Sequence, residues 1–273
     1  AYFGYTAMDW LSRLAVPAMV LLMGLSLSVA SRDVGGFAGL QGLAIDDPLP
    51  LSAAITIIVG TFVSGGTQAT NWSRFARDGR MGFIATLIAF FLGNGFLIFS
   101  GAFCAKVYGE PDIVQVMAQQ GLLVGGLILF FLNMWTTQDN TIYAFSIAGS
   151  DMFRSSRRTL FVLGGATIAL FMAWGGIYEG LVQYLILLGT FIPPIGGIVM
   201  ADYWVNRRGT FPALTDPQPA FNWAGVIAYV VSSAIAYFTG QTGWGIVPSN
   251  GIVSALVLYI LLSRVLPSSR SAA

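Results

Sequence analysis

The sequence contains no histidine and a single cysteine, Cys104. These absences exclude imidazole and multi-thiolate metal centres, iron–sulfur clusters and an internal disulfide. The usual groups of acid–base and nucleophilic catalysis are also missing, since the apolar stretches hold no paired carboxylates. We therefore expect a protein that is not an enzyme and has no cofactor.

Charge is also scarce. Only 9% of the 273 residues are charged and 56% are hydrophobic, with a mean hydropathy of +0.74, whereas soluble domains carry about 25% charged residues. This composition indicates a polytopic membrane protein with the lipid bilayer as its surroundings. The 13 basic and 12 acidic residues leave a net charge of +1, which gives no reason to expect a nucleic acid partner.

Eight apolar segments are long enough to cross a hydrocarbon core as helices, which takes about 20 residues. They are residues 7–30, 51–75, 81–108, 121–149, 159–177, 180–205, 223–240 and 248–266. We therefore predict an all-α bundle of eight transmembrane helices that forms a single domain over residues 1–273.

Basic residues are distributed unequally between the two ends of these segments. One side collects Arg13, Arg74, Arg77, Arg80, Arg154, Arg157, Arg158, Arg207, Arg208, Arg264 and Arg270, and the other holds only Arg32 and Lys106. Because cytoplasmic loops carry the excess of basic residues, we predict that both termini of the chain are cytoplasmic.

The second apolar segment contains two adjacent glycines, Gly65 and Gly66, near its middle. Each costs on the order of 1 kcal/mol in a helix relative to alanine, so we predict that the helix unwinds there. Freed backbone groups at membrane depth are typical of transporter binding sites. Thr61 and Ser64 could bond the edges of a flat ligand, and the ring of Phe62 could stack on it. The alternative is close helix packing through small residues.

Two adjacent prolines, Pro193 and Pro194, lie within the sixth apolar segment. Neither can donate a backbone hydrogen bond, so the helix must kink or open there. A plain kink is one interpretation, and a hinge or gate is the other.

The fourth apolar segment carries a dense polar run. Positions spaced i, i+3, i+4 and i+7 share one helical face, namely Asn133, Thr136, Thr137 and Asn140. Hydroxyl and amide oxygens are hard, neutral ligands that suit sodium. The alternative is that the threonines bond to carbonyls one turn earlier and the amides join helices. Gln138 and Asp139 point away from this face.

Several motifs together resemble the cytosine permeases of the nucleobase:cation symporter family. They are Val-Gly-Thr-Phe-Val-Ser-Gly-Gly-Thr at 59–67, Phe-Phe-Leu-Gly-Asn at 90–94, Asn-Met-Trp-Thr-Thr-Gln-Asp-Asn at 133–140, Ile-Pro-Pro-Ile-Gly-Gly at 192–197, and Ala-Asp-Tyr at 201–203 followed by Asn-Arg-Arg at 206–208. The resemblance covers nearly the whole chain, and the motifs occur in the family's order.

This resemblance implies a LeuT-type fold of twelve helices, of which the first ten form two inverted five-helix repeats. The chain is similar to helices five to twelve. Residues 7–30 would be the last helix of the first repeat, 51–205 the second repeat, and 223–266 two C-terminal accessory helices. The family's first four helices, which supply sodium-coordinating carbonyls and a substrate-stacking tryptophan, have no counterpart here. We therefore expect an incomplete portion that does not transport alone.

The resemblance also implies roles for individual residues. Thr61, Phe62, Ser64 and Gln138 would contact the substrate, and Asn133, Thr136 and Thr137 would bind sodium. Gly65, Gly66, Pro193 and Pro194 would form a gate or hinge. Gln138 stands where the family pattern has Asn, which leaves the particular base open.

The function implied is sodium-coupled import of a nucleobase, cytosine first, by alternating access across a bacterial cytoplasmic membrane. Another base, hydantoin or allantoin is an alternative substrate, and a proton accepted by Asp139 is an alternative coupling ion. A membrane receptor or a structural fragment without transport is the alternative function.

Overall fold

The computed structural model describes residues 5–43, 48–210 and 221–266, and every regular element in these ranges is a helix. The order is α1 (Tyr5–Asp33), α2 (Gly36–Gln41), α3 (Leu51–Thr67), α4 (Thr70–Ser73), α5 (Gly79–Leu87), η1 (Ile88–Asn94), α6 (Gly95–Tyr108), α7 (Ile113–Gln119), α8 (Leu123–Met152), α9 (Arg158–Trp174), η2 (Ile177–Gly180), α10 (Leu181–Phe191), α11 (Pro193–Met200), η3 (Ala201–Asn206), α12 (Trp223–Thr242) and α13 (Val247–Val265). The prediction of an all-α protein is confirmed.

Each of the eight predicted segments contains a helix. Within the described residues, five helices are long and apolar enough to cross a membrane, namely Asp9–Val34, Gly79–Tyr108, Leu181–Asn206, Trp223–Thr242 and Val247–Val265. The apolar helices α3 and α9 have 17 residues each. The remaining helix, α8, has 30 residues. It is less apolar than the five long helices, because it contains the polar run of residues 133–140.

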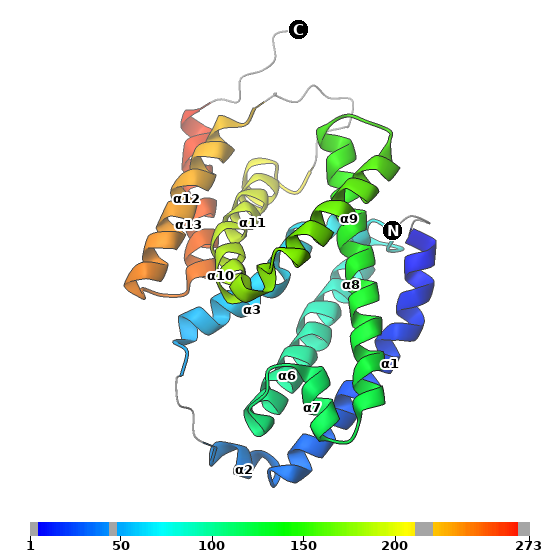
Figure 1. Cartoon of the computed structure of the whole chain (residues 1–273). Helices are drawn as coiled ribbons and strands as arrows, with labels where there is room; N and C mark the ends of the chain where they lie inside the picture. Colours follow the sequence, from blue (N-terminus) through cyan, green and yellow to red (C-terminus); the bar gives the residue numbers. More distant parts are fainter. Residues whose placement is uncertain (1–4, 44–47, 211–220, 267–273) are drawn as a thin grey trace. The chain divides into compact units, whose positions relative to one another are not determined.

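The described helices form two compact units, one from residues 5–43 and 71–177 and the other from residues 48–70, 178–210 and 221–266. In the first unit, α1 packs against α6 and α8, and α7 packs against the same two helices (Figure 1). Its core includes Met19, Met117 and Leu129 in one cluster and Phe103 with Val116 in a second. The core side chains are apolar and interdigitate between long helices, which is the packing expected of a helix bundle.

In the second unit, α3 packs along α10, while α11 and α12 pack against α13 (Figure 1). Glycines allow these close approaches. A Cβ atom at Gly60 of α3 would overlap the carbonyl oxygen of Leu185, and one at Gly189 of α10 would overlap the carbonyl oxygen of Thr56. The small-residue packing considered for the second apolar segment is therefore the role of Gly60.

Two stretches are π-helical, η1 within the third apolar segment and η3 at the end of the sixth. Such i→i+5 turns are rare and often accompany functional sites. Both coincide with motifs of the sequence, at residues 90–94 and 201–206. Nothing in the apolar pattern predicted them, because that pattern continues unchanged through both turns.

Candidate functional site

Three predicted substrate residues, Thr61, Phe62 and Ser64, lie on the last two turns of α3, in the second unit. The ring of Phe62 is 48% exposed. It lies over Gly65, where a Cβ atom would be 2.7 Å from the ring carbons Cδ1 and Cε1. Gly65 thus leaves the room that this ring orientation needs, and a side chain there would displace the ring. Gly66, by contrast, has no heavy atom within 4 Å of such a Cβ position.

The two hydroxyl groups beside Phe62 differ in their hydrogen bonding. Thr61 Oγ1 donates to the carbonyl oxygen of Ile58 at 2.6 Å, one turn earlier. The hydroxyl proton of Thr61 is therefore used in a bond to the helix backbone, while the oxygen lone pairs can still accept a hydrogen bond from a ligand. Ser64 Oγ has no hydrogen-bond partner among the described residues, so it can donate as well as accept.

The interruption predicted at Gly65 and Gly66 occurs two residues later. Helix α3 continues through both glycines and ends at Thr67, and α4 begins at Thr70. The amide of Gln68 still donates to the Ser64 carbonyl at 3.1 Å, and the Ala69 amide donates to Gly66 at 3.3 Å. The position of the break was therefore predicted slightly too early, because these i→i+3 and i→i+4 bonds carry the backbone past the glycines.

The predicted sodium ligands lie on α8, in the first unit. Asn133 and Thr137 are exposed and Thr136 is half-buried. Thr136 Oγ1 donates to the carbonyl oxygens of Leu132 at 2.9 Å and Asn133 at 3.2 Å. The alternative of back-bonding therefore holds for Thr136. It does not exclude coordination, because a cation binds the lone pairs of a hydroxyl whose proton points elsewhere.

Gln138 is also on α8 and is exposed, and Asp139 is half-buried. The helix is continuous through the whole polar run, so Gln138 lies about 100° around the axis from Thr137. In the described ranges, no group of three or more His, Cys, Asp or Glu residues could hold a metal ion.

The helix of the sixth apolar segment is interrupted at the position where the two prolines predicted a kink. Helix α10 ends at Phe191 and α11 begins at Pro193. The Ile192 amide still donates to the Leu188 carbonyl at 3.1 Å. Pro193 and Pro194 are both buried. The missing proline N–H groups account for the break, which confirms the predicted interruption; a role as hinge or gate stays a prediction.

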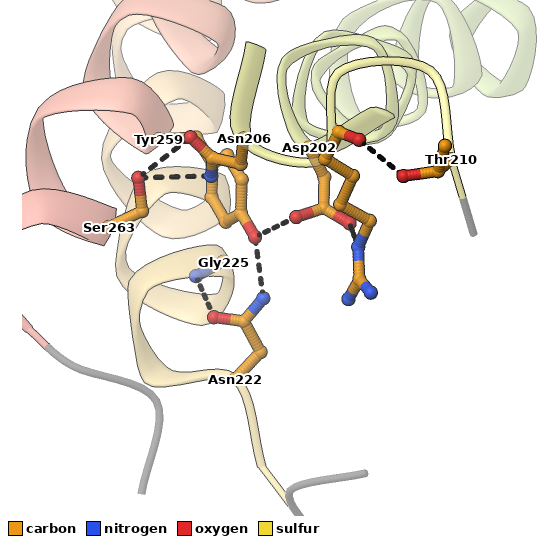
Figure 2. Close-up of polar contacts among 8 residues, drawn as sticks. Asp202, Asn206, Thr210, Asn222, Gly225, Tyr259 and Ser263 are labelled. Atoms are coloured by element: carbon orange, nitrogen blue, oxygen red, sulfur yellow. Dashed lines mark hydrogen bonds and ion pairs between the residues drawn. The ribbon is translucent and has the colours of Figure 1, made fainter. Parts of the chain in front are cut away.

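A polar network lies beyond α11, in the same unit, and Figure 2 shows its residues. Tyr259 of α13 donates from its phenol oxygen to Asp202 Oδ1 at 2.9 Å. Asn222 Nδ2 donates to the same phenol oxygen at 2.8 Å, while Asn222 Oδ1 caps α12 by accepting from the Gly225 amide at 3.1 Å.

The second carboxylate oxygen of Asp202 forms an ion pair with Arg207 Nε at 2.5 Å. One turn further along α13, Ser263 Oγ accepts from Asn206 Nδ2 at 3.1 Å. The network thus connects η3, the start of α12 and the end of α13 (Figure 2). Sequence reasoning singled out Asp202 and Arg207 as part of a motif and missed Tyr259 and Asn222, which stand alone in their segments.

A model of the family described as permeases for cytosine/purines, uracil, thiamine and allantoin matches residues 1–261. The cytosine permease of Escherichia coli strain K12 is 34% identical over 272 residues, which is 100% of this chain and 64% of the permease. The same values hold for the cytosine permease of Escherichia coli O157:H7.

A more distant relative is the hydantoin permease of Microbacterium maritypicum, which is 22% identical over 306 residues, 96% of this chain and 59% of that protein. The chain therefore spans 64% of the length of the cytosine permeases that it matches. All of these relatives are permeases rather than enzymes.

Proposed function

We propose a function from one premise: the chain belongs to the family of permeases for cytosine, purines, uracil, thiamine and allantoin. It is a multi-pass membrane protein. In our proposal it forms part of a secondary active transporter that imports a nucleobase, with cytosine as the first substrate. The observation that supports this most is the 34% identity to cytosine permease over 272 residues.

The proposed base site uses α3. The half-exposed ring of Phe62 would stack on the base, since aromatic rings and nucleobases stack favourably. Thr61 and Ser64 would bond its polar edges, because one offers lone pairs and the other a free hydroxyl. Gln138 stays a predicted substrate contact on the family resemblance alone. Gly65 supports the site by leaving room for the Phe62 ring.

The proposed coupling ion is sodium, held by the side-chain oxygens of Asn133, Thr136 and Thr137. Thr136 already directs its proton toward the helix backbone, which leaves its lone pairs for a cation. Coupling follows if sodium favours the state that binds the base, because each ligand then raises the affinity for the other. Coupling to a proton through Asp139 is the competing mechanism.

The proposed architecture is the LeuT-type inverted repeat, in a bacterial cytoplasmic membrane with the arginine-rich ends of the helices on the cytoplasmic side. Residues 7–30 would end the first repeat, 51–205 form the second, and 223–266 add two helices. The interruptions after Thr67 and at Ile192 support discontinuous helices of this kind, with Gly65, Gly66, Pro193 and Pro194 as the gate. Transport would also need further helices of the same transporter, which correspond to the rest of the relatives' length.

The experiment is uptake of radiolabelled cytosine by cells that express the complete gene product, with and without external sodium. Sodium-dependent uptake is expected, and cells that express residues 1–273 alone should show none. Equal uptake with and without sodium would overturn the proposed sodium coupling. Equal uptake by cells that express residues 1–273 alone would overturn the proposal that further helices are required.

A second candidate substrate is hydantoin, which the similarity to a hydantoin permease favours. Competition of labelled cytosine uptake by unlabelled hydantoin, allantoin and other bases separates the candidates. Strong competition by hydantoin with weak competition by cytosine itself would replace the first substrate by the second.

A further inference from the structure

Six arginines of the first unit lie in or next to two connections between helices. Three are in the connection from α4 into α5 and three in the α8–α9 turn: Arg74, Arg77, Arg80, Arg154, Arg157 and Arg158. We call them the arginine cluster. None forms an ion pair within the part of the chain that the structure describes. The cluster therefore carries positive charge that no described acidic side chain neutralises through an ion pair.

The two segments meet at Tyr143 of α8, which is only 3% exposed. Arg74 Nη2 donates to the Tyr143 phenol oxygen at 3.2 Å. The guanidinium carbon of Arg158 lies 4.2 Å from the centroid of the same ring. Two cations thus flank one phenol, and their mutual repulsion would be relieved by an anion between or beside them.

A hydrogen bond from Nε orients the Arg158 side chain, and its Nη2 group has no hydrogen-bond partner. Its Nε donates to Ser146 Oγ at 3.0 Å, and that fully buried hydroxyl donates to the Tyr143 carbonyl at 2.7 Å. Its Nη2 is buried and has no hydrogen-bond partner. A buried charged donor without an acceptor is costly, so this group indicates a preference for an anionic acceptor.

The start of α9 adds to this preference. The helix has 17 residues and begins at Arg158, and its N-cap residue, Arg157, provides no side-chain cap. The amides of Arg158 and Leu160 donate to the carbonyls of Ser156 and Arg157, so it is the helix dipole that favours an anion at this end. At α5 the situation differs, because the Asp78 carboxylate already accepts from the Met81 amide.

The length of α8 is compatible with a cluster at the level of the lipid headgroups. Tyr143 and Ser146 follow the start of α8 at Leu123 by about 20 residues, which is about 30 Å of helix and matches a hydrocarbon core of ~30 Å. The Trp72 ring lies 5.5 Å from that of Tyr143, and tryptophan is typical of this level in a membrane.

Apolar side chains border the cluster. Met152 is 80% and Phe153 is 66% exposed, immediately before Arg154. The ring of Phe75, 47% exposed, lies 4.8 Å from the guanidinium carbon of Arg74. An anion that also carries acyl chains would contact these groups, whereas a soluble phosphate would leave them unused.

We propose that the arginine cluster, with Arg158 and Arg74 at its centre, binds the phosphate of an anionic phospholipid. The guanidinium groups and the start of α9 hold the phosphate, and the exposed apolar side chains contact the acyl chains. Basic pockets at membrane ends of helices suit such headgroups.

The test is equilibrium binding of labelled phosphatidylglycerol to the purified complete gene product in mixed detergent micelles, with phosphatidylcholine as the zwitterionic comparison. We expect tighter binding of phosphatidylglycerol. Arg158→Gln and Arg74→Gln should each weaken it by about fivefold, the effect of one basic residue near a membrane surface, and leave phosphatidylcholine unchanged. Arg158→Lys should weaken it partly, because lysine keeps the charge but loses the planar fork.

The matched control is Arg264→Gln, which removes the same charge from an exposed arginine at the end of α13. It should leave phosphatidylglycerol binding intact. Equal binding of both lipids, an equal loss in Arg264→Gln, or full displacement of the lipid by inorganic phosphate at low millimolar concentration would each overturn the proposal. Arg74 is exposed, so Arg74→Gln keeps the test valid if Arg158→Gln fails to fold, which a thermal melt reveals.

Discussion

The phenol oxygen of Tyr259 lies 2.9 Å from Asp202 Oδ1, although the two residues are 57 positions apart in the sequence. This bond fixes the first turn of η3 to α13, and Asn222 extends it to the first turn of α12. Arg207 and Asn222 are the residues on either side of the α11–α12 connection, and both belong to this network. Side-chain contacts therefore link η3, the first turn of α12 and the end of α13.

Replacing Tyr259 by Phe should destabilise the protein by about 1–3 kcal/mol, since the half-buried carboxylate of Asp202 loses its hydrogen bond from a buried phenol. The measurement is thermal or denaturant unfolding of the purified chain in detergent. Tyr229→Phe in α12 is the control, because the half-buried Tyr229 hydroxyl has no bond in the described residues. Equal losses in both variants would show that the network adds no stability.

This network also shows where sequence reasoning stops. The apolar segments were predictable because a membrane helix needs an uninterrupted run of apolar residues, and the break at Pro193 followed from the missing proline N–H. The pairing of Tyr259 with Asp202 depends on how α13 packs against η3, and no local pattern records that packing. The π-helical turns at 88–94 and 201–206 were missed for the same reason.

The candidate site was partly predictable. Helical spacing correctly placed Asn133, Thr136 and Thr137 on one continuous helix, and the glycine pair marked the approximate end of α3. The exact end at Thr67 depends on hydrogen bonds beyond the glycines, which composition cannot reveal. The binding roles of all these residues stay predictions, because they depend on ligands.

Gly65→Ala should weaken base binding more than Gly66→Ala. A methyl group at Gly65 would meet the Phe62 ring at 2.7 Å and displace it, whereas at Gly66 it would meet nothing within 4 Å. We expect the Gly65 variant to approach Phe62→Ala, which should raise the KM for cytosine on the order of tenfold through lost stacking. The measurement is the concentration dependence of cytosine uptake by the complete gene product.

Gly66→Ala serves as the matched control in that experiment, because it should leave the KM unchanged and stabilise α3 by up to about 1 kcal/mol as a helical alanine. If the two alanine variants raise the KM equally, the orientation of the Phe62 ring has no part in substrate binding.

Gly60→Ala and Gly189→Ala should each destabilise the second unit by about 1–3 kcal/mol, the usual cost of overpacking. Both positions touch a backbone carbonyl of the facing helix, at Leu185 and Thr56 respectively, so α3 and α10 would have to separate. Gly196→Ala is the control, since no heavy atom lies within 4 Å of its Cβ position. Unfolding curves of the three variants decide the point, and three equal curves would contradict close glycine packing between α3 and α10.

Thr137→Ala should raise the sodium concentration needed for half-maximal uptake by at least about tenfold, since it removes a proposed ligand oxygen from the cation. The side chain is exposed on α8, so its loss should leave the fold intact. Thr141→Ala is the control: its hydroxyl donates to the Thr137 carbonyl at 3.0 Å and lies outside the proposed ligand set. Sodium activation curves at saturating cytosine provide the measurement. Identical curves for wild type and Thr137→Ala would remove Thr137 from the sodium site, and a pH-dependent curve without sodium activation would transfer the coupling to a proton.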